Sequence, residues 1–228
     1  MQKNLVEKSY NLISDMIFRY QLAPGAKVSD YVLSKSLGIS RTPIRSAMQM
    51  LLADELLVSE GSHFKVPEIT VRRVDEVYDA RLSIQTGLIR IAMKNGIEPS
   101  DICELRREID AEEECFARGD IYSSIEHDLK FNRKLSIMCG NPFLIKYYIR
   151  LEKQTRLLSL FAFALPDFNA TEFYRHICDC MMENNEEGAC EAMEKHIEVA
   201  RNQKKQILES YKDKAMEGIY SLIAKSIN

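Results

Sequence analysis

The sequence predicts a mostly α-helical protein in two parts. The first part would be an N-terminal winged helix-turn-helix with a small β-hairpin wing, and the second a C-terminal all-α antiparallel bundle. Three observations predict this fold class. Apolar residues recur about every 3.6 residues along most of the 228-residue chain. Two short helical segments near the N-terminus are joined by a three-residue turn. A single hairpin pattern follows them, near residue 60.

Composition narrows the class of protein. A hydrophobic content of 46% is ample for a folded core. No apolar run approaches the roughly 20 residues of a membrane span, and the N-terminus lacks the apolar stretch of a signal peptide, so we expect a cytoplasmic protein with no membrane partner. The six cysteines lack zinc-finger spacing. Because the net charge is only −3, a charged binding surface has to be sought locally.

The N-terminal part opens with a helix that stops at the turn signal of residues 23–25. Ser29 is placed to cap a second helix, which Gly38 would end. Ser40 is placed to cap a third, and Pro43 falls in its first turn, where a missing N–H does no harm. Two short helices joined so closely form a helix-turn-helix.

The outer face of the third helix is polar and basic. Arg41, Thr42, Arg45 and Gln49 project away from the apolar stripe, and Lys35 lies near them. Side chains of these types read base edges and phosphates in the major groove of DNA. A local basic face on an acidic protein therefore indicates double-stranded DNA as a partner.

A wing follows the third helix. Residues 56–58 and 64–66 bracket a tight turn, which predicts a β-hairpin. The DNA-contacting tip of this wing would consist of Gly61, Ser62 and His63.

A family resemblance strengthens this interpretation. The stretch LSKSLGISRTPIRSAMQMLLADELL, with SRTPIR as its most specific string, resembles the DNA-binding domain of the GntR family of bacterial transcription regulators. The resemblance covers about the first 68 residues. It implies that Arg41 and Arg45 contact bases, that Thr42 contacts a phosphate or a base edge, and that the wing tip enters the minor groove. We expect residues 1–68 to form this domain.

The second part, residues 69–228, is predicted to be helical throughout. Its apolar period is broken only at turn signals, which predicts six or seven helices and no strands. The signals lie at residues 96–100, 119–120, 140–142, 166–167 and 184–185. A last segment, residues 215–227, is expected to pack or to swap.

Three of these helices carry polar residues on their inward stripes. The residues are Arg81, Gln85, Asp128, Asn132 and His196. An inward charge without a partner costs several kcal/mol, so Arg81 and Asp128 need partners, a ligand or a water-filled cavity. An ion pair inside a plain core would explain any one of them, whereas three helices together favour a binding pocket.

A second resemblance covers about residues 70–205. The strings VYDARLSIQTGL, GDIYSSIEHDLKFNRKLSIMCGNPFL and AMEKHI resemble the FCD ligand-binding domain of FadR-type GntR regulators. The resemblance implies a bundle whose interior binds a carboxylate-containing metabolite. In many members it also holds a divalent metal through an Asp, a His one turn later and two further His. Arg81 matches the anion-binding arginine, and the effector lining would be Arg81, Gln85, Asp128, Asn132, Tyr174 and His196.

This chain departs from that metal set. Asn132 stands where a His is expected, and a gapless alignment places Tyr174 at the third ligand position. A two-residue slip would place His176 there instead, but the two side chains point about 200° apart on a helix, so both cannot serve. An amide oxygen is a weak ligand, and a neutral tyrosine rarely binds zinc-like ions. We expect no required cofactor and a lost metal site; the alternative is a weak ion on Asp128, Asn132 and His196.

Together these features predict a homodimeric transcriptional regulator, most simply a repressor, whose operator binding responds to an organic acid. Two other classes of protein explain only part of these features. A helical metal-binding protein or metalloenzyme would use Asp128 and His196, but no general base, nucleophile or phosphate loop accompanies them. A pure dimerising module would leave the outward Arg41 and Arg45 unexplained. The sequence therefore favours a regulator and not an enzyme.

Overall fold

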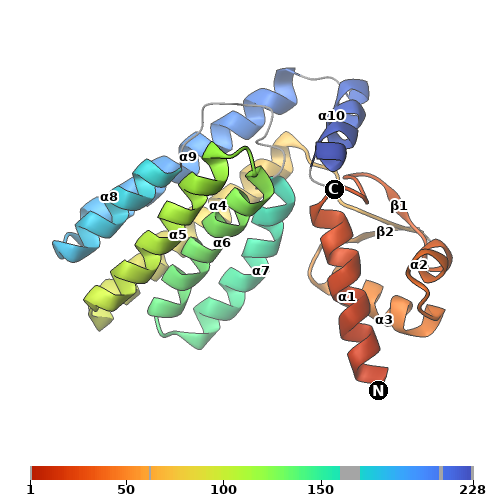
Figure 1. Ribbon diagram of the computed structural model, residues 1–228, viewed down its shortest axis with the longest axis horizontal. Helices are drawn as coiled ribbons and strands as arrows, with labels where there is room; N and C mark the ends of the chain where they lie inside the picture. Colours follow the sequence, from red (N-terminus) through yellow and green to blue (C-terminus); the bar gives the residue numbers. More distant parts are fainter. Residues whose placement is uncertain (1, 62, 160–169, 211–212, 227–228) are drawn as a thin grey trace. The chain divides into compact units, whose positions relative to one another are not determined.

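The computed structural model describes residues 2–61, 63–159, 170–210 and 213–226, which fold into two compact units (Figure 1). The first unit is Met1–Thr70 together with Tyr211–Asn228, and the second is Val71–Ser210. The sequence-based division at residue 68 falls two residues from the first of these boundaries. It differs at the C-terminus, because the last helix belongs to the first unit.

The first unit combines helices with a small sheet. Its first three helices are α1 (Gln2–Phe18), α2 (Asp30–Leu37) and α3 (Arg41–Ala53). Its strands are β1 (Lys27–Val28), β2 (Val58–Glu60) and β3 (His63–Lys65), all antiparallel, in the order β1-β3-β2. The core is formed where α1 packs on α3, with Ile13, Ile17, Ile44 and Leu51 fully buried. This arrangement confirms the helix-turn-helix with a hairpin wing.

The turn between α2 and α3 forms as the sequence predicts, with one exception. The Ser29 hydroxyl accepts a hydrogen bond from the Val32 N–H at the start of α2, and Gly38 ends the helix at φ +64°. This left-handed conformation favours glycine, which has no Cβ to clash. Ser40 occupies the N-cap position of α3, but its side chain makes no capping hydrogen bond, contrary to the expectation.

The wing hairpin is shifted relative to its predicted strands. Glu60 pairs with His63, so the strands approach the tip more closely than residues 56–58 and 64–66 would allow. Leu56 and Leu57 are buried in the core instead of entering a strand. Gly61 has φ +61°, and Ser62 lies outside the described residues. Strand β1, which pairs with Phe64 and Lys65, has only two residues and thus no periodicity to reveal it.

Helix α10 (Asp213–Ser226) belongs to the first unit, whereas the sequence-based division placed its residues in the domain of residues 69–228. Met216, Tyr220 and Ile223 recur at helical spacing and are buried. The Tyr220 ring meets the buried Tyr20 ring edge to face, with centroids 5.3 Å apart. The periodicity predicts a buried stripe, but it does not say which surface the stripe covers.

The second unit is an all-helical bundle, as predicted. Among its described residues the helices are α4 (Val71–Asn95), α5 (Pro99–Ala117), α6 (Ile121–Met138), α7 (Pro142–Ser159), α8 (Thr171–Met182) and α9 (Glu186–Ser210). Each interruption matches a turn signal, except that residues 166–167 lie outside the described ranges. No helix within those ranges is long and apolar enough to span a membrane.

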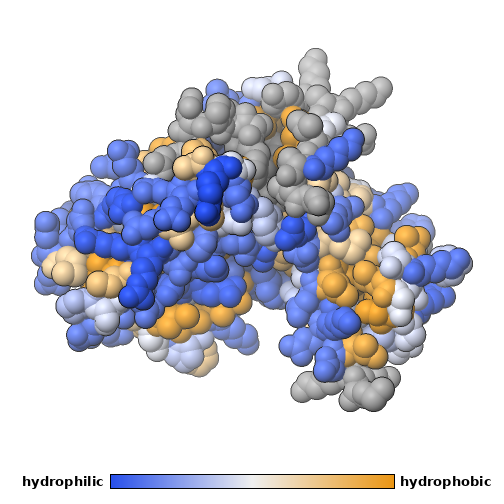
Figure 2. Space-filling model, viewed as in Figure 1, coloured by the Kyte–Doolittle hydropathy of each residue, from blue (hydrophilic) through white to orange (hydrophobic). Residues whose placement is uncertain are grey.

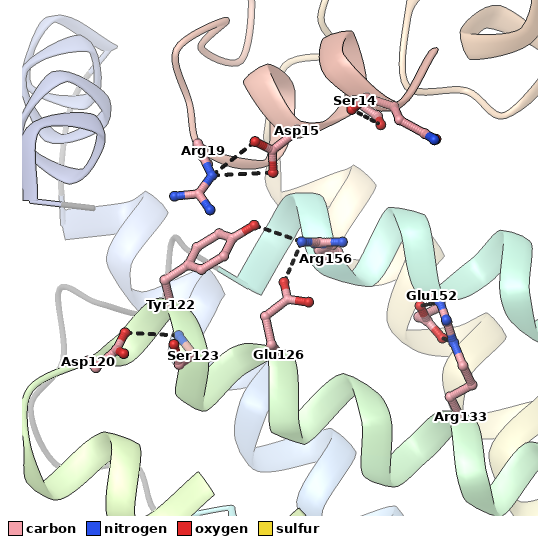
Figure 3. Close-up of polar contacts among 11 residues, drawn as sticks. Ser14, Asp15, Arg19, Asp120, Tyr122, Ser123, Glu126, Arg133, Glu152 and Arg156 are labelled. Carbon is pink, nitrogen blue, oxygen red and sulfur yellow. Dashed lines mark hydrogen bonds and ion pairs between the residues drawn. The ribbon is translucent and has the colours of Figure 1, made fainter. Parts of the chain in front are cut away.

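Polar side chains tie the outer faces of the bundle together. Figure 3 shows two such links between α6 and α7, where Arg156 donates to Tyr122 and Glu126, and Arg133 pairs with Glu152. Salt bridges also join α4 to α9, α5 to α6, and α5 to α8. Because α4, α6, α8 and α9 are held in this way, polar groups on their inward faces meet inside the unit.

Candidate functional site

The first candidate site is the outer face of α3. Its first turn presents Arg41 and Thr42, and Arg45 and Gln49 follow at intervals of about one turn; all four are exposed. The opposite face buries Ile44, Ala47 and Met48, which fixes the rotation of the helix. The structure therefore places the four predicted side chains on one surface, at the helix end that enters a major groove in helix-turn-helix proteins.

Asp30, at the start of α2, holds both arginines of this face. The Arg41 guanidinium donates to the two Asp30 oxygens at 2.9 and 3.0 Å, and the Arg45 Nε lies 3.6 Å from the same carboxylate. The side chains of Arg41 and Arg45 remain 56% and 72% exposed. Exposed ion pairs contribute only about 0–1 kcal/mol, so both arginines can exchange this carboxylate for a phosphate or a base at little cost.

The remaining predicted DNA contacts are less closely grouped. Lys35 is exposed on α2, and its ammonium lies 4.6 Å from the centroid of the Tyr31 ring. Gly61 and His63 are exposed at the wing tip. The two strands of the wing have three residues each. They are paired from Val58 and Lys65 to Glu60 and His63, and the tip lies beyond this last pair.

The second candidate site is a buried hydrogen-bonded chain inside the helical unit. The Arg81 Nε donates to the Gln85 side-chain oxygen at 2.8 Å, and the Gln85 amide donates to Asn132 Oδ1 at 2.6 Å. The Asn132 amide donates to the Tyr174 hydroxyl oxygen at 2.8 Å, and this hydroxyl donates to the Asp128 carboxylate. Helices α4, α6 and α8 are thereby joined through their inward faces.

The chemistry of the two ends fixes the direction of every hydrogen bond in this series. A guanidinium only donates hydrogen bonds, so Gln85 must turn its oxygen to Arg81 and its NH₂ to Asn132. Asn132 must then offer its own NH₂ to Tyr174. A carboxylate only accepts, which gives the Tyr174 proton to Asp128. The orientations of both amides therefore follow from the two charged ends, and each link strengthens the next.

His196 on α9 completes the cluster. Its Nε2 atom lies 3.1 Å from the Tyr174 hydroxyl oxygen and 3.4 Å from Arg81 Nη2. The hydroxyl proton already goes to Asp128, so His196 donates to the Tyr174 oxygen when Nε2 carries its proton. Phe131 stacks on the Tyr174 ring at a centroid distance of 4.1 Å. All six predicted effector-binding residues are thus brought together.

Two other histidines of the helical unit point away from this cluster. His176 is exposed on α8, and its ring contacts the Cys180 thiol. His127 bonds to Glu108 on α5 at 2.8 Å. Tyr174, by contrast, is fully buried within the cluster. The structure therefore resolves the choice between residues 174 and 176 in favour of the tyrosine.

Burial shifts the protonation equilibria of the cluster. It raises the pKa of Tyr174 well above its ordinary value, with the Asp128 charge adding to the effect. It also lowers the pKa of His196 well below its ordinary value, and Arg81 and Lys204 push it in the same direction. The pKa of Asp128 is raised by burial, although Arg81 and the Tyr174 hydrogen bond oppose this rise. Tyrosine and imidazole are therefore both neutral at physiological pH.

Glu112 is a buried carboxylic acid that the sequence analysis did not identify. It is buried on α5, and its Oε2 atom has no hydrogen-bond partner among the described residues. Burial, followed by the nearby Asp128 charge, raises the pKa of Glu112 to about 9. The sequence could have indicated this burial, because Glu112 follows Leu105 and Ile109 on the apolar stripe of α5.

Lys204 is a second residue that sequence reasoning missed. It lies on α9 two turns beyond His196, and the side chain is 5% exposed. Its ammonium lies 5.4 Å from the centroid of the Tyr78 ring, and the Arg81 guanidinium lies 4.9 Å from the same centroid. Among the described residues, no hydrogen bond or salt bridge of this ammonium is found. The stripe His196, Ala200, Lys204 continues at i, i+4, i+8 and could have revealed it.

The donor set of the cluster differs from that of a metal site. No group of three or more His, Cys, Asp or Glu side chains within the described ranges is arranged to hold a metal ion. Of the three weak candidates, Asp128 and His196 bring an oxygen and a nitrogen to the Tyr174 hydroxyl, whereas Asn132 brings an N–H. A metal ion needs a lone pair from each ligand, and a donated N–H has none to give.

Comparisons with known proteins agree with both units. Residues 5–63 match the family model described as "Bacterial regulatory proteins, gntR family", and residues 76–199 match the FCD domain. The uncharacterized HTH-type transcriptional regulator YdhC of Bacillus subtilis is 30% identical over 111 residues, which cover 48% of this chain and 49% of that protein. The HTH-type transcriptional regulator McbR of Escherichia coli is 28% identical over 124 residues, which cover 54% and 56%.

The aligned region spans about half the length of these curated relatives. A solved structure of E. coli McbR/YncC superposes with a TM-score of 0.77 at 21% identity, and the superposition covers 89% of this chain and 97% of that one. At this level of identity the likeness shows a shared fold. Since the FCD model alone covers more than half of the residues and the gntR model covers the winged helix, this chain belongs to the gntR family of bacterial regulatory proteins, with an FCD domain as its helical unit.

Proposed function

We propose that this protein is a DNA-binding transcriptional regulator, acting as a repressor, whose operator affinity changes when a small organic anion binds inside the FCD domain. The family consists of transcriptional regulators rather than enzymes, which removes the metalloenzyme alternative. The observation that carries the proposal is the outward face of α3, where Arg41, Thr42, Arg45 and Gln49 stand together above a buried stripe. These are the side chains that discriminate bases in a major groove.

DNA binding is expected to depend on Arg45 in a sequence-specific way. Arg45→Ala should weaken binding to the cognate operator by about 1–3 kcal/mol, because a bidentate contact to guanine is lost. Fluorescence anisotropy on operator DNA and on scrambled DNA of equal length measures the effect. Arg90→Ala removes an equally charged, exposed arginine from α4 and serves as the control. An equal loss on both DNAs would contradict base reading.

A homodimer fits this function, because two recognition helices related by a two-fold axis match a palindromic operator. The helical unit offers exposed apolar side chains for such an interface. Ile137 on α6 and Phe143 and Tyr147 on α7 are 57%, 74% and 61% exposed. Figure 2 shows hydrophobic residues at the lower edge of this unit, near the turn between α6 and α7. Contiguous apolar surface of this kind is typical of protein–protein contacts.

The charges of the buried cluster favour an anionic effector. The Arg81 guanidinium and the Lys204 ammonium both lie near the Tyr78 ring, and Asp128 is the carboxylate that accepts a hydrogen bond from Tyr174. Glu112 is neutral at physiological pH, since its pKa is about 9. An unmatched cation in a buried site costs several kcal/mol, and a bound carboxylate would remove this cost.

The effector proposal is tested by thermal shift with monocarboxylates, dicarboxylates, sugar acids and their uncharged amides. A true ligand at 100 times its Kd should stabilise the protein by about 2.7 kcal/mol, whereas its amide should not. Lys204→Met should reduce the shift that the acid produces, because it removes one of the two cations that lie beside the Tyr78 ring. Equal shifts by acid and amide, or an undiminished shift in the variant, would refute this assignment.

A further inference from the structure

The resemblance to FCD domains implies a metal site at the positions of Asp128, Asn132, Tyr174 and His196. In this chain, the groups at that place converge on an oxygen atom of the protein itself. Asp128, Asn132 and His196 all contact the hydroxyl of Tyr174. Its oxygen lies 2.8 Å from Asn132 Nδ2 and 3.1 Å from His196 Nε2. One phenol therefore links α8 to both α6 and α9, as a shared metal ion would.

The orientation of Asn132 is unfavourable for a cation. Its oxygen accepts from Gln85, and Gln85 is turned by Arg81, so the Asn132 NH₂ faces the Tyr174 hydroxyl. To ligate a metal, this amide would have to flip, and the flip would set its NH₂ against the Gln85 NH₂. Two donors would then face each other in a buried site, with the full cost of unmade hydrogen bonds.

Tyr174 and His196 are also unfavourable as metal ligands. Tyr174 would need to lose its proton to become a strong ligand, but burial raises its pKa well above the ordinary value. His196 points Nε2 at the hydroxyl, and the Arg81 guanidinium lies 3.4 Å from the same nitrogen. A cation at this nitrogen would be repelled by the Arg81 charge, and Lys204 adds to the positive potential.

We propose that the Tyr174 hydroxyl takes the place of a metal ion in this chain and holds the effector domain together without one. The hydroxyl accepts from Asn132 and donates to Asp128, and its oxygen lies 3.1 Å from His196 Nε2, so all three groups contact one neutral hydroxyl of the protein. The Phe131 ring stacked on Tyr174 and the complete burial of Tyr174 fix the position of the hydroxyl. This inference deepens the proposed effector site, but it does not depend on DNA binding.

The test restores the missing ligands. The double variant Asn132→His, Tyr174→His supplies two imidazoles to Asp128 and His196, which completes a four-ligand set. Purified wild-type full-length protein and the double variant are titrated with Co²⁺, whose visible absorption reports its coordination, and with Zn²⁺ in competition with a chromophoric chelator. We expect about one equivalent bound per chain by the double variant and none by the wild type. Adding Asp128→Asn to the double variant should abolish the binding.

Two results would overturn the proposal. One is stoichiometric Co²⁺ or Zn²⁺ binding by the wild type that is lost in His196→Gln, since the site would then hold a metal despite Tyr174. The other is a double variant that keeps its helical circular dichroism but binds no metal, since the hydroxyl would then not mark the metal position. If the double variant does not fold, the wild-type titration alone decides. Operator binding is measured separately in the presence of EDTA, so failure here leaves the regulator proposal standing.

Discussion

Glu112→Gln is expected to increase the free energy of unfolding of the helical unit by about 3 kcal/mol at neutral pH. The Glu112 carboxyl is buried, and its Oε2 atom has no hydrogen-bond partner among the residues that the structure describes. Burial and the neighbouring Asp128 charge raise its pKa from 4.5 to about 9. At neutral pH the folded protein must keep this carboxyl protonated, which reduces the free energy of unfolding. Glutamine is neutral at every pH and has no such cost.

The sign of the pH dependence follows from proton binding. Between pH 4.5 and about 9 the folded state keeps the Glu112 proton, whereas the unfolded state has released it. Stability therefore falls as pH rises through this window, and it levels off above the folded pKa. Below the unfolded pKa both states are protonated, so the wild type and Glu112→Gln should converge there. The stabilisation should be small near pH 5 and much larger near pH 8, and it should reach its maximum above about pH 9.

Urea denaturation followed by circular dichroism at these two pH values measures the difference. The matched control is Glu152→Gln, which changes another buried glutamate to the same amide. Glu152 is paired with Arg133, so its substitution should destabilise the protein and not stabilise it. A Glu112→Gln variant that is equally stable to the wild type near pH 8 would show that this carboxyl is solvated or ionised in the folded protein.

Tyr174→Phe is expected to decrease the free energy of unfolding by about 2–4 kcal/mol. The substitution removes one oxygen and leaves three buried partners, Asp128, Asn132 and His196, without the group that satisfies them. Unmade hydrogen bonds to buried groups cost more than a hydrogen bond contributes, and one of these partners is a carboxylate. The aromatic ring, and with it the stacking on Phe131, is retained.

Tyr148→Phe is the matched control for this substitution. Tyr148 is a buried tyrosine of the same unit, and no hydrogen bond of its hydroxyl to another described residue is found. Removing that hydroxyl should change stability little. Denaturant unfolding of both variants under the same conditions gives the comparison. Similar small losses in the two variants would mean that the Tyr174 hydroxyl is not the centre of the cluster.

Much of the fold could be predicted because its determinants are local. The turn from α2 to α3 needs a capping Ser29 and a left-handed Gly38, and both are visible in the sequence. The helices of the bundle are separated by glycine, proline and asparagine signals. Strand β1 and the exact wing register depend on pairing partners distant in sequence, and the packing of α10 depends on which surface accepts Tyr220. Periodicity contains no information about these partners.

The candidate site could be predicted to a similar extent. Inward polar residues on α4, α6 and α9 marked the cluster, since periodicity shows which side chains face inward. The sequence could not show that Asn132 turns its NH₂ to Tyr174, because this orientation is set by a chain that begins at Arg81 on another helix. It also could not distinguish Glu112 and Lys204 from solvated charges without the neighbouring helices. Their burial is a tertiary property.

In the proposed function, α3 reads a specific DNA sequence and an anion inside the helical unit controls this reading. The most direct measurement is a mobility shift with DNA selected from a genomic library by the full-length protein, in excess nonspecific competitor, with and without the acid found by thermal shift. We predict a discrete complex of two chains per DNA that survives competitor, is lost in Arg45→Ala and dissociates when the acid is added. A complex that competitor abolishes, or that Arg45→Ala leaves intact, would contradict the account.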